Sequence, residues 1–223
     1  NKRYRNLLGY TFGTGFGVGM VVDNRLNRGD NSCVETFCLE HKKIAGNIVE
    51  DGVAVRAVKR VYAELSGDTD HTFEPKEIYD IAEGKRAGNA EAARGAFAEM
   101  GEVAGNAMAT AVTLTDSLIV IGGGITAARK YIMPALLAEM RSKIRTLSGD
   151  AIGRVQMEVF DLDNDSDFEK FARGAQRELK IPGSDRTVTF DPMKRVGVAI
   201  SKMGASKAIS VGAYTFALDQ LDK

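Results

Sequence analysis

Residues 7–29 read LLGYTFGTGFGVGMVVDNRLNRG, and the glycine run at 13–19 divides this stretch into two apolar segments. The segment before the run, residues 7–12, and the segment after it, residues 20–22, are rich in residues that favour β-strands. The pair Asp23-Asn24 then supplies residues typical of a tight turn. The pattern predicts a strand, a glycine turn and a second strand.

The glycine run also predicts an anion site. Its alternating glycines allow backbone N–H groups to turn towards one point without a Cβ in the way, and Thr14 adds a hydroxyl donor. We take phosphate as the anion. The expected contacts are Gly13, Thr14, Gly15 and Gly17. The alternative is a hairpin whose glycines only permit a tight bend, and the local sequence leaves both interpretations open.

The run G-T-G-x-G-x-G at 13–19, followed by M-V-V-D-N-R-L-N-R-G at 20–29, resembles the signature of the ROK family (repressor, open reading frame, kinase). The enzymes of that family are ATP-dependent sugar kinases of the actin-like ATPase superfamily. Residues 117–124, SLIVIGGG, resemble the family's strand and glycine turn beside the adenosine, and residues 208–218 resemble its closing helix. The resemblance covers most of the chain except about residues 161–205. It implies an α/β fold: an actin-like ATPase (ribonuclease H-like) lobe whose mixed β-sheet carries helices on its faces.

The resemblance also bears on domain organisation. ROK kinases have a whole lobe before the glycine hairpin, whereas this chain starts at Asn1 and enters the hairpin almost directly. We therefore expect residues 1–223 to be the carboxyl-terminal lobe, with the amino-terminal lobe absent from this chain. The segment at about 161–202 is longer than the family usually has there, so we expect it to be an insertion.

Composition restricts the partners of this segment. Lys and Arg together number 30, as do Asp and Glu, so no basic surplus is present to hold a nucleic acid backbone. No apolar run approaches the roughly 20 residues that span a bilayer, and the start, NKRYRN, lacks a signal-peptide core. We expect a cytoplasmic protein that binds small molecules and neither nucleic acid nor membrane. A homodimer stays open.

The cysteines and histidines predict no metal site. Cys33 and Cys38 are too few for a disulfide framework or a four-ligand zinc site, and His41 and His71 lie among polar neighbours, so we expect solvated imidazoles. In the family, the His of a G-E-I-G-H motif binds zinc, and a C-x-C-G-x-x-G-C-L-E loop follows. Here Cys38 stands in the His place and residues 41–47 replace the cysteine-rich loop. We therefore expect no structural zinc.

Two carboxylates are candidates for binding sugar hydroxyls. By the resemblance, Glu35 stands in the place of the glutamate of G-E-I-G-H, and Glu50, at the start of a predicted helix, stands in the place of the glutamate of C-L-E. Glu40 is a rival for the second role because residues 38–40 reproduce the letters C-L-E. The alternative for Glu50 is a carboxylate that only favours a helix start through the macrodipole.

A second nucleotide contact is expected after residues 118–121. This continuous apolar run ends in Gly122, Gly123 and Gly124, as expected of a buried central strand that leads into a turn. Ligands in open α/β sheets bind beyond the carboxyl ends of strands, and a glycine backbone can lie flat against a purine. We predict that these glycines contact adenosine. The alternative is a plain turn from strand to helix.

Apolar spacing and turn residues predict the remaining elements. Helices are expected at about 49–65, 75–83, 90–113, 135–147 (with Pro134 at its start) and 208–221, and strands at 155–162, 178–181, 187–190 and 195–200. The acidic run at 161–167 lacks the glycine and terminal glutamate of an EF-hand in register. We interpret it as a solvated loop that caps residues 168–171.

The function that the resemblance implies is phosphorylation of a hydroxyl of a hexose or N-acetylhexosamine. ATP would lie between the turns at 13–19 and 122–124, and its Mg²⁺ would offset the phosphate charge. The family's catalytic base is an Asp that follows an Asn, and a D-x-G-G-T hairpin grips phosphate from the other lobe. We therefore expect the base in the amino-terminal lobe, assign none here, and expect this segment alone to be inactive. The alternative function is the body of a non-catalytic, sugar-sensing ROK-type transcriptional regulator.

Overall fold

A computed structural model describes residues 3–69 and 73–221, so the predicted surface position of His71 lies outside the described residues. Its centre is a six-stranded sheet in the order β3-β2-β1-β4-β10-β7. The strands are β1 Leu7–Phe12, β2 Phe16–Val22, β3 Arg25–Asn27, β4 Leu118–Gly122, β7 Glu158–Asp161 and β10 Arg195–Ile200. β1, β2 and β3 are antiparallel neighbours, whereas β1, β4, β10 and β7 run parallel. The predicted mixed sheet is confirmed.

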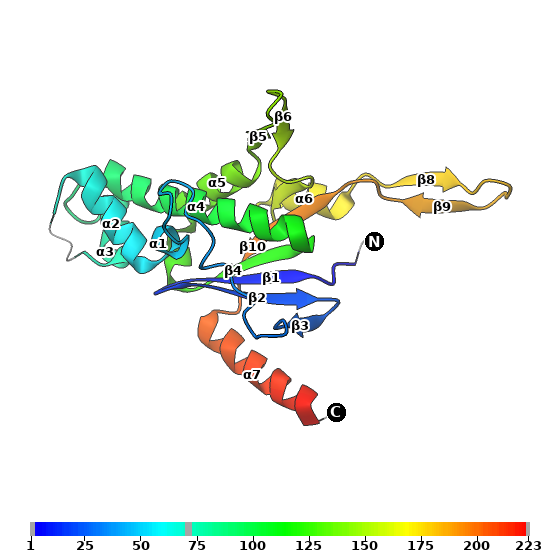
Figure 1. Ribbon diagram of the computed structural model, residues 1–223, viewed down its shortest axis with the longest axis horizontal. Helices are drawn as coiled ribbons and strands as arrows, with labels where there is room; N and C mark the ends of the chain where they lie inside the picture. Colours follow the sequence, from blue (N-terminus) through cyan, green and yellow to red (C-terminus); the bar gives the residue numbers. More distant parts are fainter. Residues whose placement is uncertain (1–2, 70–72, 222–223) are drawn as a thin grey trace.

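Most helices lie over one face of this sheet. The helices are α1 Glu50–Val53, α2 Val55–Ser66, α3 Pro75–Ala82, α4 Ala90–Thr115, α5 Arg129–Met140, α6 Asp165–Arg173 and α7 Ala205–Leu221, with a short 3-10 helix, η1, at Gly124–Ala128. Figure 1 shows α1 to α5 gathered on one side of the sheet and α7 projecting from the other. Within the described residues, every helix is too short or too polar to cross a membrane.

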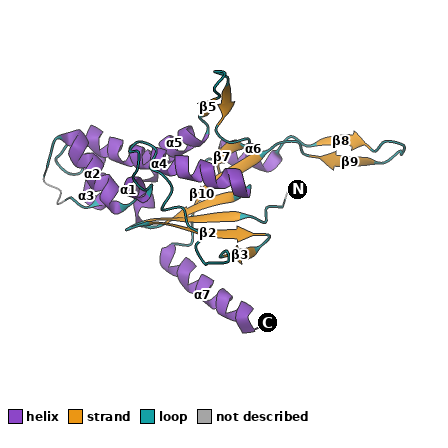
Figure 2. Ribbon diagram, viewed as in Figure 1, coloured by secondary structure: helices purple, strands orange, loops and turns teal. Residues whose placement is uncertain are grey.

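Two hairpins extend from this body. β5 (Lys143–Arg145) pairs with β6 (Ala151–Gly153), and β8 (Arg177–Lys180) pairs with β9 (Thr187–Phe190), both antiparallel. All residues of these four strands are exposed, and Figure 2 shows both hairpins standing away from the sheet. The second hairpin confirms the hairpin predicted at 178–181 and 187–190.

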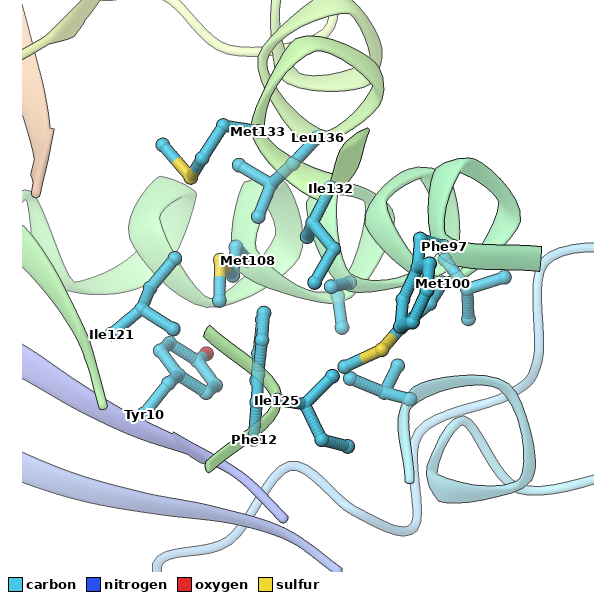
Figure 3. Packing of buried hydrophobic residues seen from close by; sticks show 14 of the residues in the cluster. Tyr10, Phe12, Phe97, Met100, Met108, Ile121, Ile125, Ile132, Met133 and Leu136 are labelled. Carbon is cyan, nitrogen blue, oxygen red and sulfur yellow. The ribbon is translucent and has the colours of Figure 1, made fainter. Parts of the chain in front are cut away.

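The core fills the space between the sheet and helices α4 and α5. In Figure 3, Tyr10, Phe12 and Ile121 extend from the strands towards Met108 on α4 and Leu136 on α5. Each of these five side chains is at most 2% exposed. Burying one large apolar side chain stabilises a fold by about 1.5–3 kcal/mol, so this layer orders the sheet beneath it.

Glycines on α4 allow α5 to approach closely. A Cβ at Gly101 would collide with the carbonyl oxygen of Ile132, and one at Gly105 would lie 2.5 Å from the carbonyl oxygen of Leu136. Gly101 and Gly105 are four residues apart, so they lie on the same face of α4. These two glycines therefore allow the backbone of α5 to pack directly against α4.

Several predicted elements differ from the structure. The strand expected at 20–22 already begins at Phe16, and α6 begins at Asp165, within the acidic run expected to be a loop. The helix expected at 135–147 is wrong, because α5 runs from Arg129 to Met140 with Pro134 inside it. After α5 the chain forms β5 and β6, joined by a turn that the side chains of Thr146 and Ser148 close. The helix expected at 49–65 is broken at Ala54, which is extended, and the strand expected at 155–162 is limited to Glu158–Asp161.

We predict that Gly101→Ala destabilises the protein, because the added Cβ meets a backbone carbonyl that cannot rotate away. Overpacking of this kind costs about 1–3 kcal/mol of unfolding free energy, which urea unfolding measures. The matched control is Gly212→Ala on α7, where a Cβ meets no atom within 4 Å. Equal stability of both variants would contradict this account of the α4–α5 contact.

Candidate functional site

The two predicted glycine turns lie next to each other. β1 and β4 are parallel, with Thr11 opposite Gly122, so the chain leaves both strands at the same edge of the sheet. Gly123 has a φ of 100°, and a Cβ there would collide with the backbone of Phe12. Gly123 therefore has a structural reason to be glycine, whereas a Cβ at Gly124 would meet nothing within 4 Å. Only one of the three glycines is thus required by the turn itself.

The glycine run differs in form from the prediction. The turn comprises only Gly13 to Gly15, because β2 begins at Phe16 and places Gly17 opposite Thr11. The N–H groups of Phe16 and Val18 point away from β1, towards side-chain carboxylates. Alternate N–H groups of an antiparallel strand point to opposite edges, so the N–H of Gly17 points towards β1. The prediction that all the glycine N–H groups of the run turn towards one point is therefore wrong.

Internal packing does not require most of these glycines. None of Gly13, Gly15, Gly17 and Gly19 has a positive φ. A Cβ at Gly13, Gly17 or Gly19 would meet no atom within 4 Å, while one at Gly15 would lie 2.8 Å from Oε2 of Glu50. Neither the backbone nor the core demands glycine at 13, 17 and 19. Their effect is to leave an open backbone surface that an external group can approach closely.

Both predicted sugar carboxylates lie along the outer edge of β2. Oε2 of Glu50 accepts a hydrogen bond from the N–H of Phe16 at 2.9 Å, and Oε2 of Glu35 accepts one from the N–H of Val18 at 3.4 Å. The rival Glu40 instead accepts from the N–H of Gly46, within its own loop. The structure therefore brings Glu35 and Glu50, and not Glu40, to the glycine hairpin.

Glu50 is held from two sides. Besides the Phe16 N–H, its Oε1 pairs with the guanidinium of Arg56 at 2.9 Å. The hydrogen bond from the Phe16 N–H, and then the bond from Arg56, hold the pKa of Glu50 below its ordinary value. Glu50 is therefore an anion whose position depends on the hairpin and on α2, and it also lies in the first turn of α1, where the helix dipole favours a carboxylate.

The break between α1 and α2 forms part of the same site. Because Ala54 is extended, the N–H of Val55 turns towards the hairpin and donates to the carbonyl oxygen of Gly13 at 3.0 Å. A hollow of about 510 Å³ lies here, lined by Thr14, Val55, Arg56, Lys59 and Arg60. The three cations each pair with a nearby carboxylate. The hollow lies directly beside the turn, and its exposed lining is mostly apolar.

The residues expected near a family zinc site do not fit a metal. Cys33 and Cys38 are free and exposed. His41 is 2% exposed, so the expectation of a solvated imidazole is wrong: its Nδ1 accepts the N–H groups of Lys43 and Ile44 at 3.1 and 3.2 Å. Burial lowers the pKa of His41. Over residues 3–69 and 73–221, no three His, Cys, Asp or Glu side chains are grouped to hold a metal ion.

Sequence reasoning missed the partners that hold the site. The N–H groups of Phe16 and Val18 and the guanidinium of Arg56 carry no motif of their own. The one Asn-Asp pair in the sequence, at 164–165, is structural, because the side chain of Asn164 caps α6. The one sequence feature related to this geometry is Gly15, because the Glu50 carboxylate occupies the space that a side chain at residue 15 would fill.

Comparisons with known proteins fit this arrangement. A model of the ROK family matches residues 1–160. The structure resembles a glucokinase from Parabacteroides distasonis, with 53% sequence identity and a TM-score of 0.91, over 98% of this chain and 59% of that chain. No curated protein matches the chain.

Two more distant structures share the fold. One is a ROK family protein from Streptococcus pneumoniae in complex with sucrose, with 21% identity and a TM-score of 0.51, over 62% of this chain and 48% of that chain. The other is a ROK hexokinase from Thermus thermophilus, with 20% identity and a TM-score of 0.50, over 61% and 49% respectively. The chain therefore spans less than two thirds of the length of these relatives.

We predict a pH-dependent effect of Glu50→Gln. The folded protein lowers the pKa of Glu50, so its stabilising contribution is complete above the unfolded value of about 4.3 and is lost as pH falls through the lower, folded value. The variant should therefore unfold at lower denaturant than the unmodified chain near neutral pH, and the difference should shrink in acid. A difference that stays constant with pH would contradict the ionic role of Glu50.

Proposed function

The chain belongs to the ROK family, and from this we propose that it is the carboxyl-terminal, nucleotide-binding lobe of an ATP-dependent sugar kinase. The reaction is transfer of the γ-phosphoryl group of MgATP to a hydroxyl of a hexose or N-acetylhexosamine. One observation carries the proposal: two glycine turns adjoin at the carboxyl ends of β1 and β4, and neither packing nor φ requires most of their glycines.

The hairpin turn is the proposed phosphate site. Gly13, Thr14 and Gly15 form its tip, where Thr14 is exposed and the Gly13 position is open. Gly17 contributes an open backbone surface on the adjoining part of β2, and its own N–H is left to the ladder. Backbone dipoles in such a turn bind phosphate without the entropy cost of ordering a long side chain. Mg²⁺ arrives with the nucleotide and offsets the remaining charge.

The turn at Gly122, Gly123 and Gly124 is the proposed adenosine site. Gly123 closes the turn against Phe12, which fixes the distance between this turn and the phosphate turn. A Cβ at Gly122 would meet nothing nearer than 3.8 Å, so its backbone, like that of Gly124, leaves room for a flat base. The position beyond the carboxyl ends of parallel strands is the usual ligand edge of an open α/β sheet.

Glu35 and Glu50 are the proposed sugar contacts. Both carboxylates lie on the outer edge of β2, next to the phosphate turn. The backbone N–H groups that bind them, of Phe16 and Val18, are two residues apart on that strand. A carboxylate oxygen can accept more than one hydrogen bond, so each can bind a sugar hydroxyl and keep its backbone donor. Sugar and γ-phosphate would then meet at one edge of the sheet, as phosphoryl transfer requires.

A second lobe is part of the proposal. α7 carries apolar side chains, yet none of its described residues is buried. The Parabacteroides distasonis glucokinase that matches 98% of this chain continues beyond the matched 59% of its own length. Both observations support an amino-terminal lobe that covers α7, closes over the site and supplies the catalytic base. The alternative, a sugar-sensing regulator body, gives the open glycine surface no role.

The phosphate site is tested by Gly13→Val, with Gly19→Val as the matched control. A Cβ meets nothing within 4 Å at either position, so both variants should fold. Only Gly13 belongs to the turn, so its side chain would occupy the path of the phosphate. Calorimetric titration with MgATP should show affinity lower by about tenfold or more, ~1.4 kcal/mol, for Gly13→Val alone. Gly15→Val would be ambiguous because its Cβ also displaces Glu50.

Catalysis is tested by an assay that couples ADP release to a panel of hexoses and N-acetylhexosamines. This chain alone should be silent, because general-base help is worth about 10²–10⁴-fold and no base is assigned within it. The complete gene product should turn over one of these sugars. Turnover by this chain alone would place a base within it, and silence of the complete protein with intact sugar binding would favour the regulator.

A further inference from the structure

The segment that joins the two sugar carboxylates is a closed loop of residues 37–49. At its base the N–H of Glu50 donates to the carbonyl oxygen of Phe37 at 3.3 Å, and that of Val49 donates to Leu39 at 2.7 Å. Further along, the backbone N–H of His41 donates to the carbonyl oxygen of Asn47 at 2.8 Å. The loop therefore begins just after Glu35 and ends at Glu50, so its placement decides where both carboxylates lie.

Two lysines attach this loop to the helical layer. Nζ of Lys42 lies 2.7 Å from Glu102 on α4 and 2.5 Å from Glu139 on α5. Nζ of Lys43 lies 3.1 Å from Glu99 and 2.9 Å from Glu102, both on α4. We call these five residues the lysine clamp. A network that shares carboxylates between lysines holds its geometry better than an isolated surface pair.

The clamp is partly withdrawn from water. Glu139 is only 7% exposed, and its second oxygen faces Nε of Arg154 at 3.4 Å. Burial alone would lower the pKa of Lys42, but hydrogen bonds from its ammonium group to Glu102 and Glu139 outweigh burial and raise that pKa. Loss of the Lys42 charge would remove one of the two cations that face the buried Glu139 carboxylate, and removing one partner of a buried ion pair is destabilising.

His41 transmits this attachment to α1. Its buried ring lies against Gly52, where a Cβ would collide with Nε2. α1 has only four residues and cannot hold itself as an isolated helix. Its first residue, Glu50, is thus placed by the 37–49 loop on one side and by the glycine hairpin on the other.

We propose that Lys42 and Lys43 are positioning residues for the sugar site: through the 37–49 loop, the lysine clamp sets Glu50 and Glu35 against the N–H groups of Phe16 and Val18. This rests on the proposed function only for its kinetic consequence. The structural consequence is independent of any ligand, because the protected N–H groups exist in the chain by itself.

The test compares Lys42→Met with Lys76→Met, which removes an exposed pair with Asp80 on α3. Amide hydrogen exchange is measured at Phe16 and Val18 and divided by exchange in α4, which corrects for global stability. Lys42→Met should raise this ratio on the order of tenfold, Lys42→Arg should restore it, and Lys76→Met should not change it. An unchanged ratio for Lys42→Met would overturn the proposal. If Lys42→Met fails to fold, Glu99→Gln, which removes one partner of Lys43, is read by the same ratio.

The kinetic arm uses the complete protein. Lys42→Met should raise the KM for the sugar on the order of tenfold and change the KM for ATP much less, since misplacing a binding group weakens its own ligand first. Equal rises in both KM values would overturn the positioning role. A raised exchange ratio without any sugar phosphorylation would uphold the clamp and reject the kinase, so the two proposals fail separately.

Discussion

The parallel pairing of β1 with β4 is the constraint on which the whole site depends. It is fixed by the core, because Leu8, Tyr10 and Phe12 alternate on the buried face and are each at most 2% exposed. A slip of one residue in the pairing would expose this entire set of side chains. Registers shifted by one residue are therefore strongly disfavoured. Once the register is set, both glycine turns leave the sheet at one edge, and β2 must return along the other side of β1 with its outer N–H groups free for Glu35 and Glu50.

Elements with a strong local pattern could be predicted from the sequence. β1 occupies the residues expected, β4 and α4 extend the predicted ranges by one and two residues at their carboxyl ends, and the 178–190 hairpin is present. In each case a single stretch carries both the apolar periodicity and its turn residues, so no distant partner is needed to recognise it. The position of the glycine turn was predictable for the same reason, since β-favouring residues lie on both sides of it.

What could not be predicted depends on partners far away in sequence. His41 has polar neighbours along the chain, yet the loop folds back and buries it against Gly52. The apolar spacing of residues 49–65 gives no sign of the break at Ala54, where the N–H of Val55 bonds to the carbonyl oxygen of Gly13, about 40 residues earlier. The pairing of Glu50 with the Phe16 N–H is likewise a tertiary contact, so motif position could identify the residue but not its geometry.

The hydrogen bonds of Glu50 would make the affinity for one proposed ligand depend on the binding of the other. One of its oxygens is shared with the strand that presents the glycine hairpin, and the other with Arg56 on α2, whose first N–H holds the hairpin carbonyl. A ligand that hydrogen-bonds to Glu50 would alter these bonds, and a ligand that moves the hairpin would alter the position of the Glu50 carboxylate. Binding at the two proposed subsites would therefore be thermodynamically coupled, and such coupling is reciprocal: the factor by which the first ligand changes the affinity for the second equals the factor in the opposite direction.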